Sequence, residues 1–470
     1  MLFNSLSFVY FLPIVILLYY ILPHKFRWIL LLLASYIFYM AWRVEYIFLI
    51  VFSTLIDYYC SLKMESKETK KEKKKFLMLS MFSNLGLLFF FKYFNFFSDS
   101  LNSISFNFGL TTELPMLNYL LPVGISFYTF QTLSYSLDVY HGRQKAEKHL
   151  GYFALYVAYF PQLVAGPIER FSRLSPQLKE KHPFTYDNFV NGLRLILYGL
   201  FIKMVIADNL SVYVDQIYES PGDFNRLSVA FGLIIYSFQI YCDFHGYTTI
   251  AIGCALMMGV KIMDNFKTPY LSKNIGEFWQ RWHISLSTWF RDYVYLPLGG
   301  NKVKYSLWLR NIFIVFVVSG LWHGANWTFV IWGSLYGLLY LIEKQINSYL
   351  KLNKDYKAFS VGHILLSLKT FTLVTLIWVF FRSQNLSQIK ELFSALIYNS
   401  DNLNSLEINP IVYMFFGLFI MSDFILYNNR FDRWCAQLSF ISRWTVYAVL
   451  IFATITFAGI KDFTFIYFQF

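Results

Sequence analysis

The chain has 470 residues, of which 57% are hydrophobic and 14% are charged, and its formal net charge is +12. A soluble domain carries roughly 25% charged residues, so this composition excludes an ordinary soluble domain and predicts a polytopic membrane protein. The positive charge does not indicate nucleic-acid binding, because the Lys and Arg residues gather in short segments between apolar runs. The four cysteines lie in or beside apolar runs without metal-ligand spacing. We therefore expect neither disulfides, nor a bound metal, nor a bound cofactor.

Apolar segments that approach the roughly 20 residues needed to cross a bilayer as a helix recur along the whole chain. They lie at 8–22, 28–42, 45–62, 76–97, 118–140, 188–206, 228–259, 309–322, 327–347, 362–381, 410–427 and 442–460. One further apolar piece, 151–165, contains Pro161 and is short, so it is predicted to be re-entrant or tilted. Irregular backbone at membrane depth must be buried in protein or line a cavity.

The charges of the loops predict the orientation of the chain in the membrane. Lys63–Lys75 holds seven lysines and three glutamates and is predicted to be cytoplasmic. The next loop, Ser98–Asn118, has two acidic residues and no basic residue, so it should face outward. Continuing the alternation places Lys261–Ser306 in the cytoplasm and both termini outside.

One histidine, His323, stands in the apolar run Ser319–Trp327, between segments that read as lipid-embedded helix. An ionisable side chain at membrane depth is costly and is a functional-site candidate by default. It lies on the order of 20 Å from the cytoplasmic face at 1.5 Å per helical residue. A general base and a structural histidine in a helix kink both fit the residues alone. Asn326 and the Trp322 indole add hydrogen-bond donors beside it.

A second candidate region carries tryptophans and arginines at helical spacing over Glu277–Tyr293, which predicts a helix at the membrane interface. His283 lies within it, and an aromatic-belt position or a role in orienting substrate are both open. Arg281, Arg291 and Lys302 have the chemistry to bind donor phosphates, although anchoring at the cytoplasmic face explains them equally well.

Acidic residues occur in several predicted spans. Asp243 and His245 are two residues apart, so they do not face each other on a helix and do not form a simple dyad. We expect packing polarity between helices for this pair. For Asp57, Asp138 and Asp423 we expect partners at helix ends or on neighbouring helices.

The runs at 277–300 (EFWQRWHISLSTWFRDYVYLPLGG) and 319–333 (SGLWHGANWTFVIWG) resemble the membrane-bound O-acyltransferase family, most closely its bacterial alginate O-acetyltransferase branch. Further matching stretches lie at 121–131, 159–170, 241–246 and 465–470, so the resemblance covers nearly the whole chain. His245 departs from the pattern, since relatives usually carry a small residue there.

The resemblance implies an all-α membrane fold, a single domain over 1–470 with its motif core at 118–347. It implies a ring of about 11–13 tilted and re-entrant helices around a central tunnel. His323 matches the family's catalytic histidine, and His283 matches its second motif histidine. Arg281, Arg291, Asn326 and Trp322 are then candidates for binding the donor or the oxyanion.

The same resemblance implies acetyl transfer from a cytoplasmic thioester, acetyl-CoA, to an extracytoplasmic polysaccharide such as an alginate-like exopolysaccharide or peptidoglycan. Relatives commonly work with a periplasmic partner of the serine-hydrolase-like type. Two alternatives stay open at this point. One is transfer of D-alanine from an acidic carrier protein, which the lysine-rich loop would dock. The other is a transporter without a covalent role for His323, although the chain shows no internal repeat of the kind expected for that class.

Overall fold

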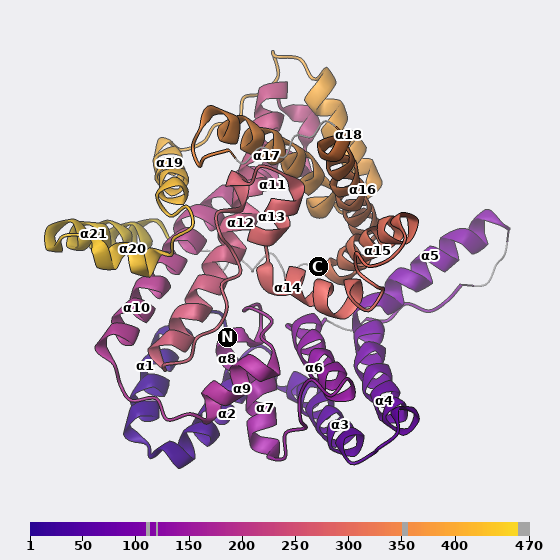
Figure 1. The fold of residues 1–470 in the computed structure, drawn as a ribbon. Helices are drawn as coiled ribbons and strands as arrows, with labels where there is room; N and C mark the ends of the chain where they lie inside the picture. The colour runs from indigo at the N-terminus through magenta and orange to yellow at the C-terminus, as the bar shows by residue number, and fades with distance from the viewer. Residues whose placement is uncertain (110–112, 119–120, 350–355, 459–470) are drawn as a thin grey trace. The chain divides into compact units, whose positions relative to one another are not determined.

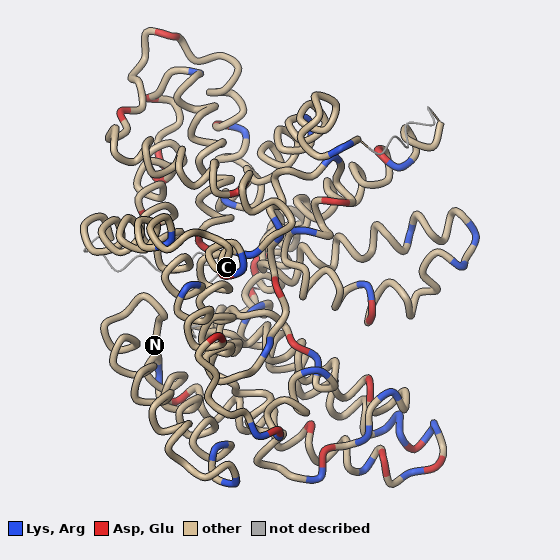
Figure 2. The backbone as a smooth tube through the Cα atoms, turned by 60° about the vertical axis from the view of Figure 1, so that its left-hand side comes forward, with Lys and Arg blue, Asp and Glu red and all other residues tan. Residues whose placement is uncertain are grey.

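The computed structural model describes residues 1–109, 113–118, 121–349 and 356–458, and these residues form helices and loops without a named strand (Figure 1). Long stretches of helical backbone carry no charged residue (Figure 2). Within the described ranges, seven helical segments are long and apolar enough to cross a membrane. They are Val44–Glu65, Lys70–Asn107, Tyr186–Glu219, Arg226–Met257, Tyr305–His323, Val361–Arg382 and Phe440–Phe457. The prediction of an all-α polytopic protein is confirmed.

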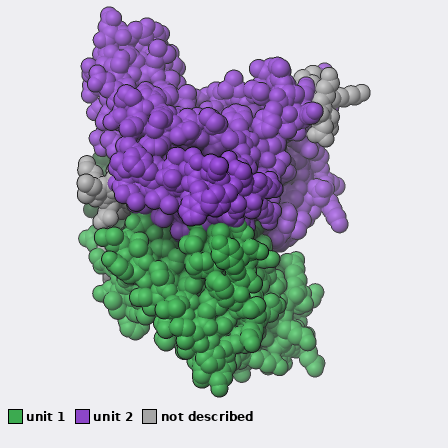
Figure 3. All heavy atoms as spheres, turned by 90° about the vertical axis from the view of Figure 1, so that its left-hand side faces the viewer, with its two compact units in different colours: residues 1–193, 251–263 green, residues 194–250, 264–470 purple. Residues whose placement is uncertain are grey.

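The chain divides into two compact units (Figure 3). Unit 1 comprises Met1–Leu193 and Ala251–Met263, and unit 2 comprises Arg194–Ile250 and Asp264–Phe470. Helices α10 (Tyr186–Leu200) and α12 (Arg226–Met257) contribute residues to both units. The single domain over 1–470 stays a prediction, and the matching stretch at 465–470 lies outside the described residues.

Unit 1 is built from short and long helices that follow the predicted apolar segments. Its elements are α1 (Leu6–Ile21), α2 (His24–Met40), η1 (Val44–Tyr46), α3 (Ile47–Glu65), α4 (Lys70–Leu88), η2 (Phe89–Tyr93), α5 (Phe94–Asn107), α6 (Ile125–Tyr140), α7 (Leu150–Ala158), α8 (Phe160–Leu163) and α9 (Phe171–Lys179). The predicted break in 151–165 is confirmed, because Tyr159 leaves helical geometry between α7 and α8. Its re-entry into the membrane stays a prediction.

A buried carboxylate joins three helices of unit 1. Asp57 on α3 accepts hydrogen bonds from the Ser80 hydroxyl and the Asn84 amide on α4, the latter at 2.9 and 3.0 Å. The Ser136 hydroxyl on α6 donates to the same carboxylate at 3.3 Å. Polar side chains that bond across helices hold membrane bundles together, so the predicted interhelical role of Asp57 is confirmed.

Unit 2 carries the histidine-containing motifs. Its elements are η3 (Phe201–Ala207), α11 (Asp208–Glu219), η4 (Pro221–Asp223), η5 (Pro269–Leu271), α13 (Ile275–Arg281), α14 (Ile284–Phe290), η6 (Arg291–Tyr295), α15 (Tyr305–His323), α16 (Trp327–Tyr349), α17 (Val361–Arg382), α18 (Leu386–Tyr398), α19 (Pro410–Ile425), α20 (Phe431–Gln437) and α21 (Phe440–Phe457). Large aromatic side chains, among them Trp282, Trp332 and Trp378, fill its interior.

The predicted interfacial helix over Glu277–Tyr293 is wrong in one respect. The chain forms two short helices, α13 and α14, and His283 between them has a left-handed backbone with φ of 43°. Trp282 and Trp289 are buried inside unit 2. Trp282, directly before His283, is extended, with φ of −103° and ψ of 129°. Helical spacing in the sequence could not reveal this break, because residues on both sides of it are helical.

Glycines let α15 and α16 approach closely just before His323. A Cβ atom added at Gly320 would overlap the carbonyl oxygen of Phe329, and one added at Gly333 would overlap the carbonyl oxygen of Phe316. Small residues at such crossings allow membrane helices to pack backbone to backbone. The position of His323, one turn beyond Gly320 at the end of α15, therefore depends on this contact.

Replacing Gly320 by alanine should destabilise unit 2, because backbone atoms at this crossing leave no room for a methyl group. Overpacking of this kind costs about 1–3 kcal/mol. We expect Gly320→Ala to lower the Tm of the detergent-solubilised protein, measured by thermal unfolding. Gly417→Ala on α19 is the control, since an added Cβ atom there meets nothing within 4 Å. Equal Tm values for the two variants would contradict the proposed close contact.

Candidate active site

His323 is the last residue of α15 and lies in an aromatic environment. Its ring centre is 4.9 Å from the ring of Trp322, 5.1 Å from that of Trp332 and 5.3 Å from that of Phe381. The residue is 4% exposed. The helix ends directly after it at Gly324. His323 thus combines a position at a helix end with nearly complete exclusion from solvent.

His283 lies beside His323 although the first stands between α13 and α14 and the second ends α15. The two imidazole ring centres are 6.3 Å apart. His283 is 0% exposed, and its ring packs 4.7 Å from Phe244 and 5.9 Å from Trp322. The His283 side chain is thus buried among aromatic rings of unit 2, and its role in orienting substrate stays a prediction.

Burial lowers the pKa of His283 to about 3, since the surroundings disfavour the imidazolium cation. The imidazole is therefore neutral at physiological pH, with one N–H donor and one acceptor nitrogen. Two imidazoles at this separation are close enough for one small reacting group to contact both. The arrangement suits proton transfer combined with stabilisation of a developing negative charge in a water-poor environment.

The two candidates that flank His323 in sequence have different surroundings. Trp322 contacts both histidine rings. Asn326 instead stabilises the start of α16: its side-chain oxygen accepts from the Thr328 N–H at 3.0 Å, and its amide donates to the Gln384 carbonyl at 2.8 Å. The structure thus groups Trp322 with the histidines and gives the Asn326 side chain two protein partners.

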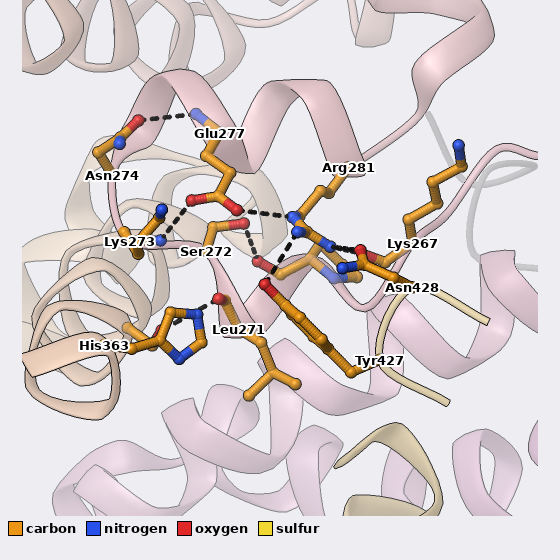
Figure 4. Close-up of polar contacts among 12 residues, drawn as sticks. Lys267, Leu271, Ser272, Lys273, Asn274, Glu277, Arg281, His363, Tyr427 and Asn428 are labelled. Atoms are coloured by element: carbon orange, nitrogen blue, oxygen red, sulfur yellow. Dashed lines mark hydrogen bonds and ion pairs between the residues drawn. The ribbon is translucent and has the colours of Figure 1, made fainter. Parts of the chain in front are cut away.

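Arg281 is held by protein groups on several sides (Figure 4). Its guanidinium forms an ion pair with Glu277 at 2.9 Å and donates to the Tyr427 hydroxyl at 3.1 Å. It also donates to the Asn428 side chain and to the Lys267 carbonyl, both at 3.0 Å. This geometry favours a structural clamp between α13 and the segment that follows α19.

Arg291 has a more open position at the start of η6. Its side chain is exposed and pairs with its neighbour Asp292 at 2.9 Å. Surface ion pairs are weak, so this guanidinium can exchange its partner for a phosphate more easily than Arg281 can. Of the two arginines, Arg291 is the better candidate for contacting an anionic donor.

Sequence reasoning missed a polar cleft of about 620 Å³ between the start of α13 and the end of α16. Its lining includes Lys273, Glu277, Gln280, Tyr340 and Lys344. On the same two helices, the rings of Trp279 and Tyr336 lie 5.0 Å apart, and Trp332 packs 5.1 Å from Tyr336. These residues come from two segments far apart in the sequence, and no sequence motif marked them as a group.

A buried cluster of charges lies near the histidines. Lys203 on η3 forms ion pairs with Asp208 at 2.6 Å and with Asp243 at 2.5 Å, and all three side chains are buried. Asp243 directly precedes Phe244, whose ring contacts His283. Sequence reasoning treated Asp243 as general packing polarity because Lys203 lies on a different predicted span.

His245 points to other partners, as expected from its spacing with Asp243. Its ring stacks on Tyr241 at 5.3 Å, with 4° between the ring planes. The Tyr241 hydroxyl donates to Asp423 on α19 at 3.1 Å, so the interhelical role predicted for Asp423 is confirmed. No group of three or more His, Cys, Asp or Glu residues in the described ranges has the arrangement of a metal site.

The sequence is similar to a known protein family and to several known proteins. The sequence model of the membrane-bound O-acyltransferase family matches residues 42–382. A probable alginate O-acetylase of Pseudomonas syringae pv. tomato is 40% identical over 92% of this chain and 83% of its own length. A peptidoglycan O-acetyltransferase of Helicobacter pylori is 36% identical over 84% and 80%, respectively. A teichoic acid D-alanyltransferase of Bacillus subtilis is 31% identical over 50% and 61%.

Removing the cation from the buried cluster should destabilise the protein strongly. Lys203→Met leaves Asp208 and Asp243 buried without their counter-ion, and breaking a buried pair costs about 3–5 kcal/mol. We expect a lower Tm than for wild type, and partial recovery when Asp208→Asn and Asp243→Asn are added. Lys267→Met is the control, because that side chain is exposed. A wild-type Tm for Lys203→Met would show that the pairing contributes little.

Proposed function

The chain belongs to the membrane-bound O-acyltransferase family and is a membrane O-acyltransferase, and on this basis we propose that it acetylates a polysaccharide of the cell envelope. The proposed donor is a cytoplasmic thioester, acetyl-CoA. The proposed acceptor is a hydroxyl of an alginate-like exopolysaccharide or of peptidoglycan. The observation that carries the proposal is the pair of buried imidazoles, His283 and His323, with ring centres 6.3 Å apart.

In the proposed reaction, His323 is the general base. Its imidazole takes the proton of the incoming hydroxyl while the hydroxyl oxygen attacks the thioester carbonyl carbon. The tetrahedral intermediate collapses, the C–S bond breaks, and the thiolate leaves and recovers the proton from His323. A thiol pKa of about 8.5 makes the thiolate a good leaving group. The products are an acetyl ester and free CoA.

The neighbouring residues supply the electrostatics of this proposal. Because burial keeps the pKa of His283 near 3, its neutral ring offers an N–H to the oxyanion. The Trp322 indole and the Asn326 amide are further candidates from the sequence. Of these two, Trp322 is better supported, because its ring contacts both histidines whereas the Asn326 amide already bonds to Gln384.

The proposed location is the inner membrane, with the donor approaching from the cytoplasm and the acceptor lying outside. The lysine-rich segment Lys63–Lys75 supports this orientation, since positive loops stay in the cytoplasm. The acetyl group would then pass either directly to the glycan or to a serine of a periplasmic, serine-hydrolase-like partner. An activated group carried through a site shielded from water avoids hydrolysis of the thioester.

A second candidate is transfer of D-alanine from a carrier protein to an envelope polymer. It is supported by the similarity to a teichoic acid D-alanyltransferase and by the lysine-rich segment, which suits an acidic carrier. That similarity covers 50% of the chain, against 92% for the alginate O-acetylase relative, so we favour acetyl transfer. The transporter alternative is not retained for a member of an enzyme family.

Loss of the proposed base should abolish acetyl transfer without loss of the fold. In a strain lacking the native copy, we expect His323→Gln to reduce ester-linked acetate in the envelope polymers by at least about 10²-fold, the lower range for general-base catalysis. His141→Gln, at an exposed position, is the control. Analysing alginate-like polymer and peptidoglycan separately identifies the acceptor. Normal acetate in a well-expressed His323→Gln protein would overturn the assignment.

The two arginines should respond differently to neutralisation. Arg291→Gln is expected to raise the KM for acetyl-CoA about threefold to tenfold with little change in kcat or Tm, because one charge-assisted contact of about 1 kcal/mol is lost. Arg281→Gln is expected to lower the Tm, because its guanidinium bonds to Glu277, Tyr427 and Asn428. Steady-state kinetics on purified protein and thermal unfolding test both. If instead Arg281→Gln raised the KM and Arg291→Gln lowered the Tm, Arg281 would be the donor-binding residue and Arg291 the structural one.

A further inference from the structure

His283 occupies a helix start where its own side chain is not used for capping. It is the N-cap residue of α14, with φ of 43° and ψ of 53° and no side-chain hydrogen bond to the helix. A non-glycine residue in the left-handed region is uncommon and costs backbone strain, which surrounding contacts must offset. The strained backbone of His283 beside the proposed base His323 must therefore be held by contacts from neighbouring residues.

Another histidine of the same chain shows the ordinary alternative. His149 is the N-cap residue of α7, with an extended backbone at φ of −99°, and its Nδ1 atom accepts a hydrogen bond from the Tyr152 N–H at 3.3 Å. An imidazole that caps its own helix in this way is fixed against that helix. The two histidines therefore occupy the same N-cap position, but only His149 uses its ring to cap the helix.

Asn265 supplies the missing cap for α14. Its side-chain oxygen accepts from the Ser285 N–H at 3.1 Å, and its backbone carbonyl accepts from the Ile284 N–H at 3.0 Å. These are the first two N–H groups of α14, which have no partner within the helix. Asn265 is 1% exposed. The segment before α13 thus reaches the helix start and satisfies it from outside.

We propose that Asn265 is a positioning residue for His283. It caps α14 in place of the imidazole and so holds the left-handed backbone of His283, which directs this ring toward Trp322 and His323. The catalytic consequence rests on the proposed function, whereas the positioning itself does not. The side-chain oxygen is the atom that matters, because Ser285 donates to it. An aspartate at this position keeps that acceptor oxygen and should therefore preserve the positioning. A leucine of similar size lacks the acceptor and should not.

Kinetics of the purified full-length protein with acetyl-CoA test the catalytic consequence. We expect Asn265→Leu to lower kcat by about 10-fold to 100-fold, with the KM for acetyl-CoA within threefold of wild type, a range typical of lost positioning. Asn265→Asp should retain at least a third of the wild-type kcat. In a His283→Gln background, Asn265→Leu should change kcat less than twofold, because it acts through the imidazole. An equal loss in both backgrounds would overturn the proposal.

A second measurement is independent of the donor and of acetyl transfer. Diethyl pyrocarbonate modifies accessible imidazoles, and mass spectrometry reports the modified fraction at each histidine. We expect at least tenfold faster modification of His283 in Asn265→Leu than in wild type or Asn265→Asp, with exposed His141 as the internal reference. If His323→Gln kept full activity while this pattern held, only the proposed function would fail.

The remaining outcomes also decide the question. Unchanged His283 modification and unchanged kcat in folded Asn265→Leu would overturn the positioning role. Asn265→Ala serves as the second variant, because a smaller truncation avoids overpacking. If both variants failed to fold, Asn265 would be a structural residue of the α14 start, and the proposal would also be overturned.

Discussion

Removing polar groups from water is costly, and this cost governs which side chains pair inside the protein. Inside a membrane protein, a charge or an N–H group must find a partner within the fold or serve the chemistry. Asp57 meets this constraint by joining three helices, and Lys203 meets it by bonding two carboxylates. The same constraint applies to His283, which lies among aromatic rings where burial lowers its pKa and favours the neutral imidazole.

The general plan of the protein could be predicted from the sequence, and the pairings within it could not. The apolar runs and the break within 151–165 follow from composition and periodicity, which are local properties. The pairing of Lys203 with Asp243 joins two different predicted spans, and a single sequence does not show which spans meet. The clamp at Arg281 was hidden for the same reason, since its partners Tyr427 and Asn428 follow α19.

The short helices around His283 show a different limit of sequence reasoning. Tryptophans and arginines at helical spacing predict one helix, and most residues of that stretch are indeed helical. The exceptions are Trp282 and His283, which leave helical geometry. The helix that follows them is capped by Asn265 from a separate segment. Its position among tryptophans and arginines made His283 a candidate and the family resemblance supported it, whereas only the structure shows that it lies in a left-handed turn. Rules of local preference tend to fail where a site requires a particular geometry.

The part of the chain after the family match contacts the segments that carry the family motifs. The match ends at residue 382, yet Arg281 bonds to residues at 427 and 428, and Tyr241 bonds to Asp423. These contacts fasten the motif-bearing segments to a tail that lies beyond the family signature. Chimeras that exchange this tail between relatives would therefore replace one partner of each contact and keep the other. A successful graft has to carry the matching partners of Arg281 and Tyr241 with it.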